Sequence, residues 1–167
     1  MSAGVARAEY VATHGSFYPA NSGGFAFDRC VRVGREETLI LQHLAIVVML
    51  PTPAAEQPWS DFRAATMRDT HALTKGSQLQ IEIDGRLRVL QLPAYVALGD
   101  PFRVFHMRPR PRRRRGFDGY WLMHGIHLSP GSDYRVILRF DGDAPEITTP
   151  GLWIGVVISG QQWSGRP

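Results

Sequence analysis

Apolar and polar residues alternate along most of this chain, and this alternation constrains the fold more than any other feature of the sequence. DYRVILRF, residues 133–140, and GLWIGVVISG, residues 151–160, show it most clearly. Successive side chains of a strand point to opposite faces, so each segment predicts a strand with one buried face. Similar segments occur at residues 23–33, 39–50, 78–93, 93–106 and 119–128. About eight short strands separated by glycine and proline turns predict an all-β antiparallel sandwich, in the form of a single jelly roll.

The hairpin within residues 78–93, QLQIEIDGRLRVLQLP, is predicted in detail. Asp84-Gly85 supplies a turn, but a two-residue loop would place the apolar Ile83 opposite the charged Arg86. A loop of three residues, with Arg86 included, removes this conflict and adds a cross-strand charge pair. The expected pairs are Ile83 with Leu87, Ile81 with Val89, and Glu82 with Arg88.

Residues 51–76 interrupt the strand pattern and are expected to form an insertion within one domain that spans residues 1–167. The proline-rich PTPAAEQP at 51–58 is expected to be a loop. PWSDFRAATMRDTHAL at 58–73 is expected to contain one short helix, with Ser60 as its N-cap. Its apolar stripe is thin and consists of Phe62, Ala65 and Ala72.

Positive charge is concentrated in MRPRPRRRRG, residues 107–116. The formal net charge is +4, and subtracting the six arginines of this tract leaves −2 for the rest of the chain. Two prolines exclude a regular helix, so we expect an exposed loop between strands. The loop would contact nucleic acid, another polyanion or a neighbouring subunit, or have no partner. No recognition helix adjoins it, which makes nucleic acid the less favoured partner. Its arginines are Arg108, Arg110, Arg112, Arg113, Arg114 and Arg115.

Two segments, LAIVVML at 44–50 and WIGVVI at 153–158, are apolar on both faces of a strand. A sandwich covers only the inner face, so the outer face must be covered by the 51–76 insertion or by another subunit. Trp121, Trp153 and Trp163 are the expected anchors of such an oligomer interface. The longest apolar run is far shorter than the ~20 residues of a membrane helix, so no transmembrane segment is expected.

No group of residues predicts catalysis, a metal site or a cofactor. His124 and His127 are three residues apart in an expected strand and would point to opposite faces. Cys30 lies in an alternating segment, where a buried and unreactive thiol is the usual outcome. DGDAPE at 141–146 lacks a flanking helix and a full set of oxygen ligands, so it is expected to be a polar turn. With one cysteine and no secretory signal, the protein is expected to be soluble and made in a reducing compartment.

SPGSDY at 129–134 is similar to the proline-glycine element of the second motif of the cupins, a β-barrel family. Cupins also carry a His-x-His pair followed by a glutamate, and a further histidine shortly after that glycine. This chain has no His-x-His, and Tyr134 lies near the position of the later histidine. The likeness therefore does not extend to the metal ligands, and a metal-dependent cupin activity is not expected.

The pattern of strands resembles the small single-jelly-roll structural proteins of bacterial virus particles, of the capsid, decoration or head-spike-base type. The stretches that carry the resemblance are ETLILQHLAIVVMLP, QLQIEIDGRLRVLQLP, IHLSPGSDYRVILRF and GLWIGVVISG. The resemblance implies a non-enzymatic protein of the virion, assembled in the host cytoplasm, that associates with itself and with other virion proteins. It implies no catalytic or ligand-binding residues.

Two other functions are consistent with the sequence. One is a carbohydrate- or receptor-binding sandwich in which Trp59, Trp121 or Trp163 stacks on sugar rings. The other is a polyanion- or nucleic-acid-binding protein that uses the arginine tract.

Overall fold

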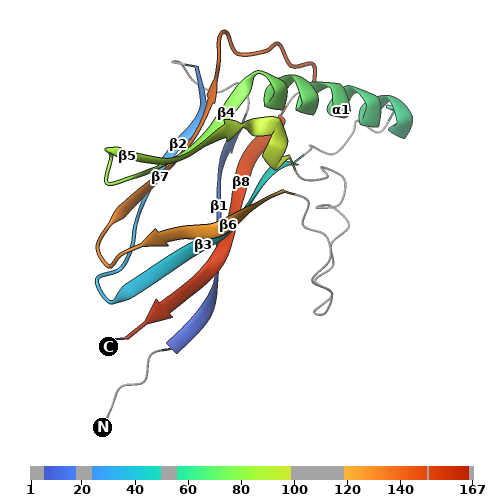
Figure 1. Cartoon of the computed structure of the whole chain (residues 1–167). Coiled ribbons are helices and arrows are strands. Elements are labelled where there is room, and N and C mark those ends of the chain that lie inside the picture. Colours follow the sequence, from blue (N-terminus) through green and yellow to red (C-terminus); the bar gives the residue numbers. More distant parts are fainter. Residues whose placement is uncertain (1–5, 18–23, 50–55, 99–118, 150, 166–167) are drawn as a thin grey trace.

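The described part of the chain forms two four-stranded antiparallel sheets that pack face to face (Figure 1). The computed structural model describes residues 6–17, 24–49, 56–98, 119–149 and 151–165. Residues 6–17 form a strand that was not predicted from the sequence. Residues 94–97, within the segment 93–106 that was predicted to be strand, form a 3-10 helix, and residues 99–106 lie outside the described residues. Sheet A contains, in spatial order, β1 (Ala6–Phe17), β8 (Trp153–Ser164), β3 (Glu37–Met49) and β6 (Tyr120–Leu128). Sheet B contains β2 (Phe25–Arg32), β7 (Asp133–Phe140), β4 (Ser77–Ile83) and β5 (Leu87–Pro93).

The order of the strands is that of a jelly roll. The orders β1-β8-β3-β6 and β2-β7-β4-β5 place each strand of the first half beside its counterpart from the second half. The pairs are β1 with β8, β2 with β7, β3 with β6, and β4 with β5. A long hairpin rolled over on itself in this way gives eight strands in two sheets. The predicted all-β antiparallel sandwich and its jelly-roll form are confirmed.

The core lies between the inner faces of the two sheets. Alternation along β7 buries Tyr134, Val136, Leu138 and Phe140, as the sequence predicts. The facing strand β8 contributes Ile154, Val156 and Ile158, all of which are buried. Each such side chain stabilises the fold by about 1.5–3 kcal/mol when it leaves water.

The β4–β5 hairpin confirms two of its three predicted pairs. Asp84 and Gly85 both have positive φ, and the Arg86 N–H donates to the Ile83 carbonyl oxygen at 3.2 Å. Because Ile83 pairs with Leu87, Asp84, Gly85 and Arg86 form the predicted three-residue loop. The register pairs Ile83 with Leu87 and Glu82 with Arg88, but Ile81 with Leu90 and not with Val89. This third pair was predicted wrongly, because a bulge adds one residue to β5. The bulge sets Leu79 opposite Leu92, whereas an unbroken register would set Leu79 opposite Gln91.

One α-helix, α1 (Trp59–Lys75), lies across the end of the sandwich (Figure 1), and a short 3-10 helix, η1 (Ala94–Ala97), packs near it. The predicted cap is wrong. Pro58 occupies the N-cap position, and the Ser60 hydroxyl donates to the side chain of Asp61 at 3.3 Å. Among the described residues, no helix is long and apolar enough to cross a membrane.

The face that α1 buries is mostly polar. Phe62 is buried as predicted, but Ala65 and Ala72 are only half-buried. The other buried residues are Thr66, Asp69, Thr70, Leu73 and Thr74. Thr66 and Thr74 donate their hydroxyl protons to the carbonyl oxygens of Phe62 and Thr70, each at 2.9 Å. These hydroxyls are satisfied within the helix, so their methyl groups can pack like those of small apolar residues.

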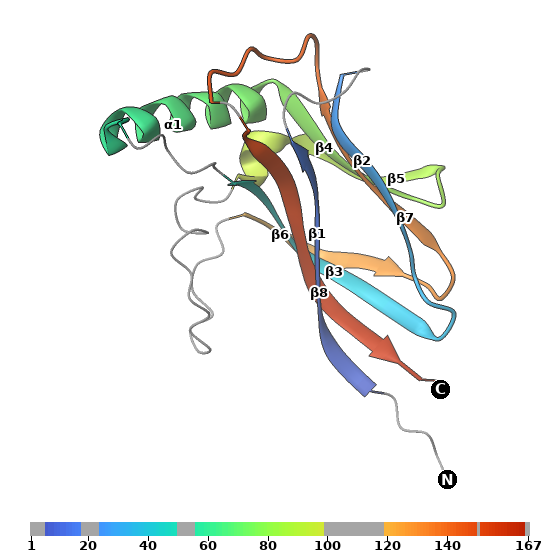
Figure 2. The same ribbon diagram turned by 180° about the vertical axis from the view of Figure 1, so that it is seen from behind.

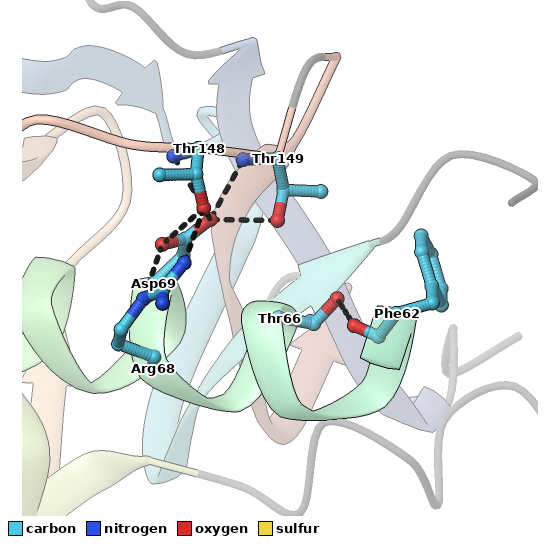
Figure 3. Close-up of polar contacts among 6 residues, drawn as sticks. All are labelled: Phe62, Thr66, Arg68, Asp69, Thr148 and Thr149. Atoms are coloured by element: carbon cyan, nitrogen blue, oxygen red, sulfur yellow. Dashed lines mark hydrogen bonds and ion pairs between the residues drawn. The ribbon is translucent and has the colours of Figure 1, made fainter. Parts of the chain in front are cut away.

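Asp69 ties α1 to the segment between β7 and β8 (Figure 3). Asp69 is 2% exposed, and its Oδ2 accepts hydrogen bonds from the backbone N–H groups of Thr149 at 2.7 Å and Thr148 at 3.1 Å. The hydroxyls of Thr149 and Thr148 donate to the same oxygen at 2.6 and 3.1 Å. The Arg68 guanidinium lies 3.7 Å from Oδ1. Burial alone would raise the pKa of Asp69, but the hydrogen bonds from Thr149 and Thr148 outweigh it, so the pKa lies below its ordinary value.

Candidate functional site

The outer face of sheet A carries exposed apolar side chains. In the strand register, Phe17 lies opposite Trp153. Val11 and Trp121 lie in one row across the sheet, joined through Ser159 of β8 and His43 of β3. Paired residues share a face, and the alternate residues of β8 are in the core, so these side chains point away from the core. We name as the apolar patch Val11, Phe17, Trp121, Trp153 and Val157. Val11 is 58%, Phe17 69% and Trp121 65% exposed.

No charged side chain interrupts this patch among the residues that the structure describes. The other outward positions between the row of Val11 and the row of Phe17 carry no aspartate, glutamate, lysine or arginine among the described residues. They are Thr13, Gly15, His43, Ala45, Val47, Gly155 and Ser159. His43, Ala45, Val47 and Gly155 are buried, so the exposed side chains of this face belong to β1, β8 and β6. Charge begins farther along β1, at Glu9 and Arg7. The described residues of this half of the outer face of sheet A thus include no acidic residue, lysine or arginine.

The outer face of sheet B is of the opposite kind. Arg135 donates from Nε to Asp28 Oδ1 at 2.6 Å, and its Nη2 donates to Asp28 Oδ2. Glu82 of β4 lies beside Arg135 in the strand register, and a second ion pair joins Arg32 to Asp133 at 3.8 Å. Such pairs are typical of a sheet surface in water. Sheet B therefore has a solvent face, whereas sheet A has a face suited to contact with another surface.

The three predicted anchor tryptophans all lie on the outer face of sheet A, but not in one cluster. Trp121 packs against His43, with the ring centroids 4.6 Å apart. Trp163 lies toward the charged end of the sheet, where the Arg7 guanidinium is 5.7 Å from its ring centroid. Trp153 and Trp163 are ten residues apart on one strand, which separates them by about 33 Å. Their role as anchors of an interface stays a prediction.

Trp153 lies flat on the sheet because two glycines make room for it. Gly15 and Gly155 are paired across β1 and β8. A Cβ added to Gly155 would lie 2.2 Å from Cη2 of Trp153, and one added to Gly15 would lie 2.3 Å from its Cζ2. The indole thus covers the backbone of both strands and forms part of the surface of the patch.

The free edge of sheet A is irregular at β6. Leu41 pairs with Ile126 and His43 with Trp121, so four residues of β6 lie opposite Gln42 alone. Met123, within this bulge, is 94% exposed. A bulge of this kind interrupts the row of backbone groups that an added strand would use. The shape of the edge favours contact through the face of sheet A over strand addition at β6.

The arginine tract lies outside the described residues. Arg108, Arg110, Arg112, Arg113, Arg114 and Arg115 all fall within residues 99–118, and residues 51–55 of the predicted insertion also lie outside. Their contacts stay predictions.

The prediction for the cysteine is wrong, because the side chain of Cys30 is exposed. Phe27 faces the core, so Cys30, three positions later, points outward from the edge strand β2. Within the part of the chain that the structure describes, no three histidine, cysteine or acidic side chains form a group that could hold a metal ion. His124 and His127 are exposed on β6, and residues 141–144 of the predicted polar turn are exposed.

Two histidines that the sequence did not single out occupy defined environments. His43 is buried beneath Trp121, and His14 lies between the two sheets beside Tyr134. Neither belongs to a recognisable motif, so only the pairing of distant strands identifies them.

No family model matches this chain, and neither the curated proteins nor the solved structures include a match.

Proposed function

We propose that this protein is a non-enzymatic structural subunit that associates with copies of itself through the apolar patch on sheet A. The observation that carries the proposal is the contrast between the two outer faces. Sheet B presents ion pairs to solvent, whereas sheet A presents Phe17 and Trp121 at more than half exposure. Exposed apolar side chains that gather on one face of a sandwich are a feature of interaction sites.

The occupant we propose is a second copy of the same face. The patch offers no charged group and, in the row from Gly15 to Gly155, no bulky side chain except the flat Trp153 indole. A partner surface must therefore be flat and uncharged, because a charge buried against it would lose its hydration without compensation. The same patch on another molecule meets these requirements, and a two-fold axis would bring the two together. The outer face of sheet B, with Asp28 and Arg135, does not.

Trp121 and Phe17 would supply most of the contact energy. Aromatic side chains at the centre of an interface are frequent hot spots, and removal of one costs about 2 kcal/mol or more of binding free energy. Two charges placed in the patch would weaken association still further, since each would be desolvated.

Sedimentation equilibrium tests the proposal with two matched double variants. Val11→Lys with Trp121→Lys places one lysine on each edge strand of sheet A, at exposed patch positions. Cys30→Lys with Gln91→Lys does the same on the edge strands of sheet B, at exposed positions. We expect the wild-type chain to associate as concentration rises, the sheet A variant to weaken association by at least about 100-fold, and the sheet B variant to leave it unchanged.

A wild-type chain that stays monomeric up to about 1 mM would overturn the proposal, since its association free energy would then be weaker than about 4 kcal/mol. An equal loss of association in both variants would also overturn it, because the contact would then not be specific to sheet A.

The setting we propose is a virus particle. The eight-stranded jelly roll is an architecture that capsid proteins use, and the sequence resembles small structural proteins of bacterial virus particles. In that setting the arginine tract, residues 108–115, would contact a neighbouring subunit or a polyanion. If all six arginines met duplex phosphates, the logarithm of the binding constant would fall with the logarithm of salt concentration with a slope of about −5.

Carbohydrate binding is the second candidate, and the exposed Trp121 ring favours it. Lectin domains also use the jelly roll, and a flat exposed indole can stack on a sugar ring. A glycan array separates the two candidates, since a saturable signal that Trp121→Ala abolishes would favour the lectin.

A further inference from the structure

One edge of the sandwich is closed by polar contacts where the rest of the core is apolar. The inner face of β1 presents Tyr10, His14 and Ser16 toward sheet B. The Tyr10 and Tyr134 hydroxyls contact each other, and the Ser16 hydroxyl donates to the Ala26 carbonyl oxygen. We call this line of contacts the β1 seam. Figure 2 shows β1 at the edge of sheet A, beside β8 along its length.

His14 is the titratable centre of the seam. Its Nε2 lies 3.4 Å from the Tyr134 hydroxyl oxygen, and the two rings meet edge to face at a centroid distance of 6.2 Å. Tyr134 is fully buried, so its hydroxyl depends on partners within the protein. A neutral His14 with its proton on Nδ1 can accept a hydrogen bond from the Tyr134 hydroxyl at Nε2, and the Tyr134 oxygen can accept one from Tyr10, which would satisfy the buried hydroxyl on both sides.

Protonation of His14 disrupts this arrangement in two ways. The imidazolium has no acceptor nitrogen, so the hydrogen bond to Tyr134 must reverse direction. A positive charge also enters a half-buried site. The groups that face the ring are Tyr10 on β1, Tyr134 on β7 and the positive Arg29 on β2, and on β8 the paired residue is the apolar Val156. None of these groups is a carboxylate that could stabilise the charge.

We propose that the β1 seam is a pH-sensitive latch: protonation of His14 breaks the side-chain contacts of β1 with sheet B and thereby promotes detachment of β1 from β8, its partner in sheet A. Burial lowers the pKa of His14 from its ordinary value of 6.5, and the charge of Arg29 lowers it further. Above pH 6.5 the ring is neutral whether β1 is closed or open, and pH has no effect. Below pH 6.5 His14 is protonated in the open state before it is protonated in the closed state, where its pKa is lower. The free energy that favours the closed seam therefore falls as the pH drops from 6.5 through the lowered pKa.

Amide hydrogen exchange of the wild-type chain, at a concentration where it is monomeric, tests the latch. We expect the opening of residues 6–17, corrected for the intrinsic rate, to increase by up to about tenfold per pH unit below 6.5. The central strands β4 and β7 of sheet B should show a smaller change. If β1 and the central strands respond equally to pH, the change is global and the latch is overturned.

Three variants assign the effect to the histidine. His14→Gln removes the titration and should abolish the extra opening of β1 at low pH. His127→Gln, at an exposed position of sheet A, should keep the wild-type response. Arg29→Gln changes an exposed side chain and should raise the midpoint, which keeps the latch testable even if His14→Gln does not fold.

An NMR titration of the His14 ring tests the latch independently of hydrogen exchange. A midpoint below 6.5 that moves upward in Arg29→Gln supports the latch, and a midpoint at or above 6.5 in the wild-type chain overturns it. Because β1 also carries Val11 and Phe17, its release would remove two residues of the apolar patch; this consequence, unlike the latch itself, rests on the proposed function.

Discussion

At the scale of single residues, the surface of the patch depends on the absence of side chains at two positions. The Trp153 indole occupies the space above Gly15 and Gly155, where any Cβ would overlap it. The tryptophan is therefore held in one orientation by the sheet beneath it, and its outer ring face becomes a flat part of the surface.

Gly155→Ala should displace the indole and destabilise the fold by about 1–3 kcal/mol, as overpacking usually does. Denaturant unfolding measures the loss, and a shift in tryptophan emission reports the displacement. Gly142→Ala is the matched control, because nothing lies within 4 Å of its added Cβ, and it should change stability by less than about 0.5 kcal/mol. Equal effects of the two substitutions would show that the indole does not rest on Gly155.

At the scale of elements, the described strands other than β1 follow from the sequence, but their irregularities do not. Alternation identifies the buried residues of β7 and the turn of the β4–β5 hairpin, because a strand period and a positive φ are local properties. The bulge after Arg88 is tertiary in origin: it aligns Leu90 and Leu92 with Ile81 and Leu79 across the sheet. The consecutive apolar pair Val89-Leu90 is the local signal that could have indicated it.

The helix, too, is only partly predictable from the sequence. Its position follows from the change in composition at residues 58–73, whereas its buried face does not, because threonines are not counted in an apolar stripe. The i→i−4 hydrogen bonds of Thr66 and Thr74 are what make that face compatible with burial. Asp69 was missed because its partners Thr148 and Thr149 lie about eighty residues away in the sequence.

Asp69→Asn should loosen α1 from the β7–β8 segment and destabilise the protein by about 2–3 kcal/mol at pH 7. The amide keeps the shape but replaces one charged acceptor by a donor that faces N–H and O–H donors. Because the pKa of Asp69 is lowered in the folded state, its contribution is present above the ordinary value of 3.8 and is lost as the pH falls through the lowered pKa.

Urea unfolding of Asp69→Asn from pH 7 to pH 2 checks both statements. The difference from wild type should shrink with acid, and Asp61→Asn, in the exposed first turn of α1, should differ from wild type by less than about 0.5 kcal/mol. A difference that stays constant down to pH 2 would show that the carboxylate charge is not what holds the helix.

At the scale of the whole molecule, the two sheets of one jelly roll have different outer surfaces. The sequence predicts the surplus of apolar strand faces, and the even spacing of ten residues places Trp153 and Trp163 on one face. That Trp121 shares this face requires the β3–β6 register, which joins residues about eighty positions apart. The β1 seam likewise joins His14 to Tyr134 across 120 residues, so no local pattern could reveal it.

Hydroxyl-radical footprinting of the wild-type chain at low and high concentration tests the apolar patch most directly. Trp121 is exposed on sheet A, whereas Trp59 and Met67 are exposed on α1 and serve as internal references. Contact through the patch predicts that the oxidation rate of Trp121 falls as concentration rises while the rates of Trp59 and Met67 stay constant. A Trp121 rate that does not change while the chain associates, or protection of Trp59 and Met67 in its place, would contradict contact through sheet A.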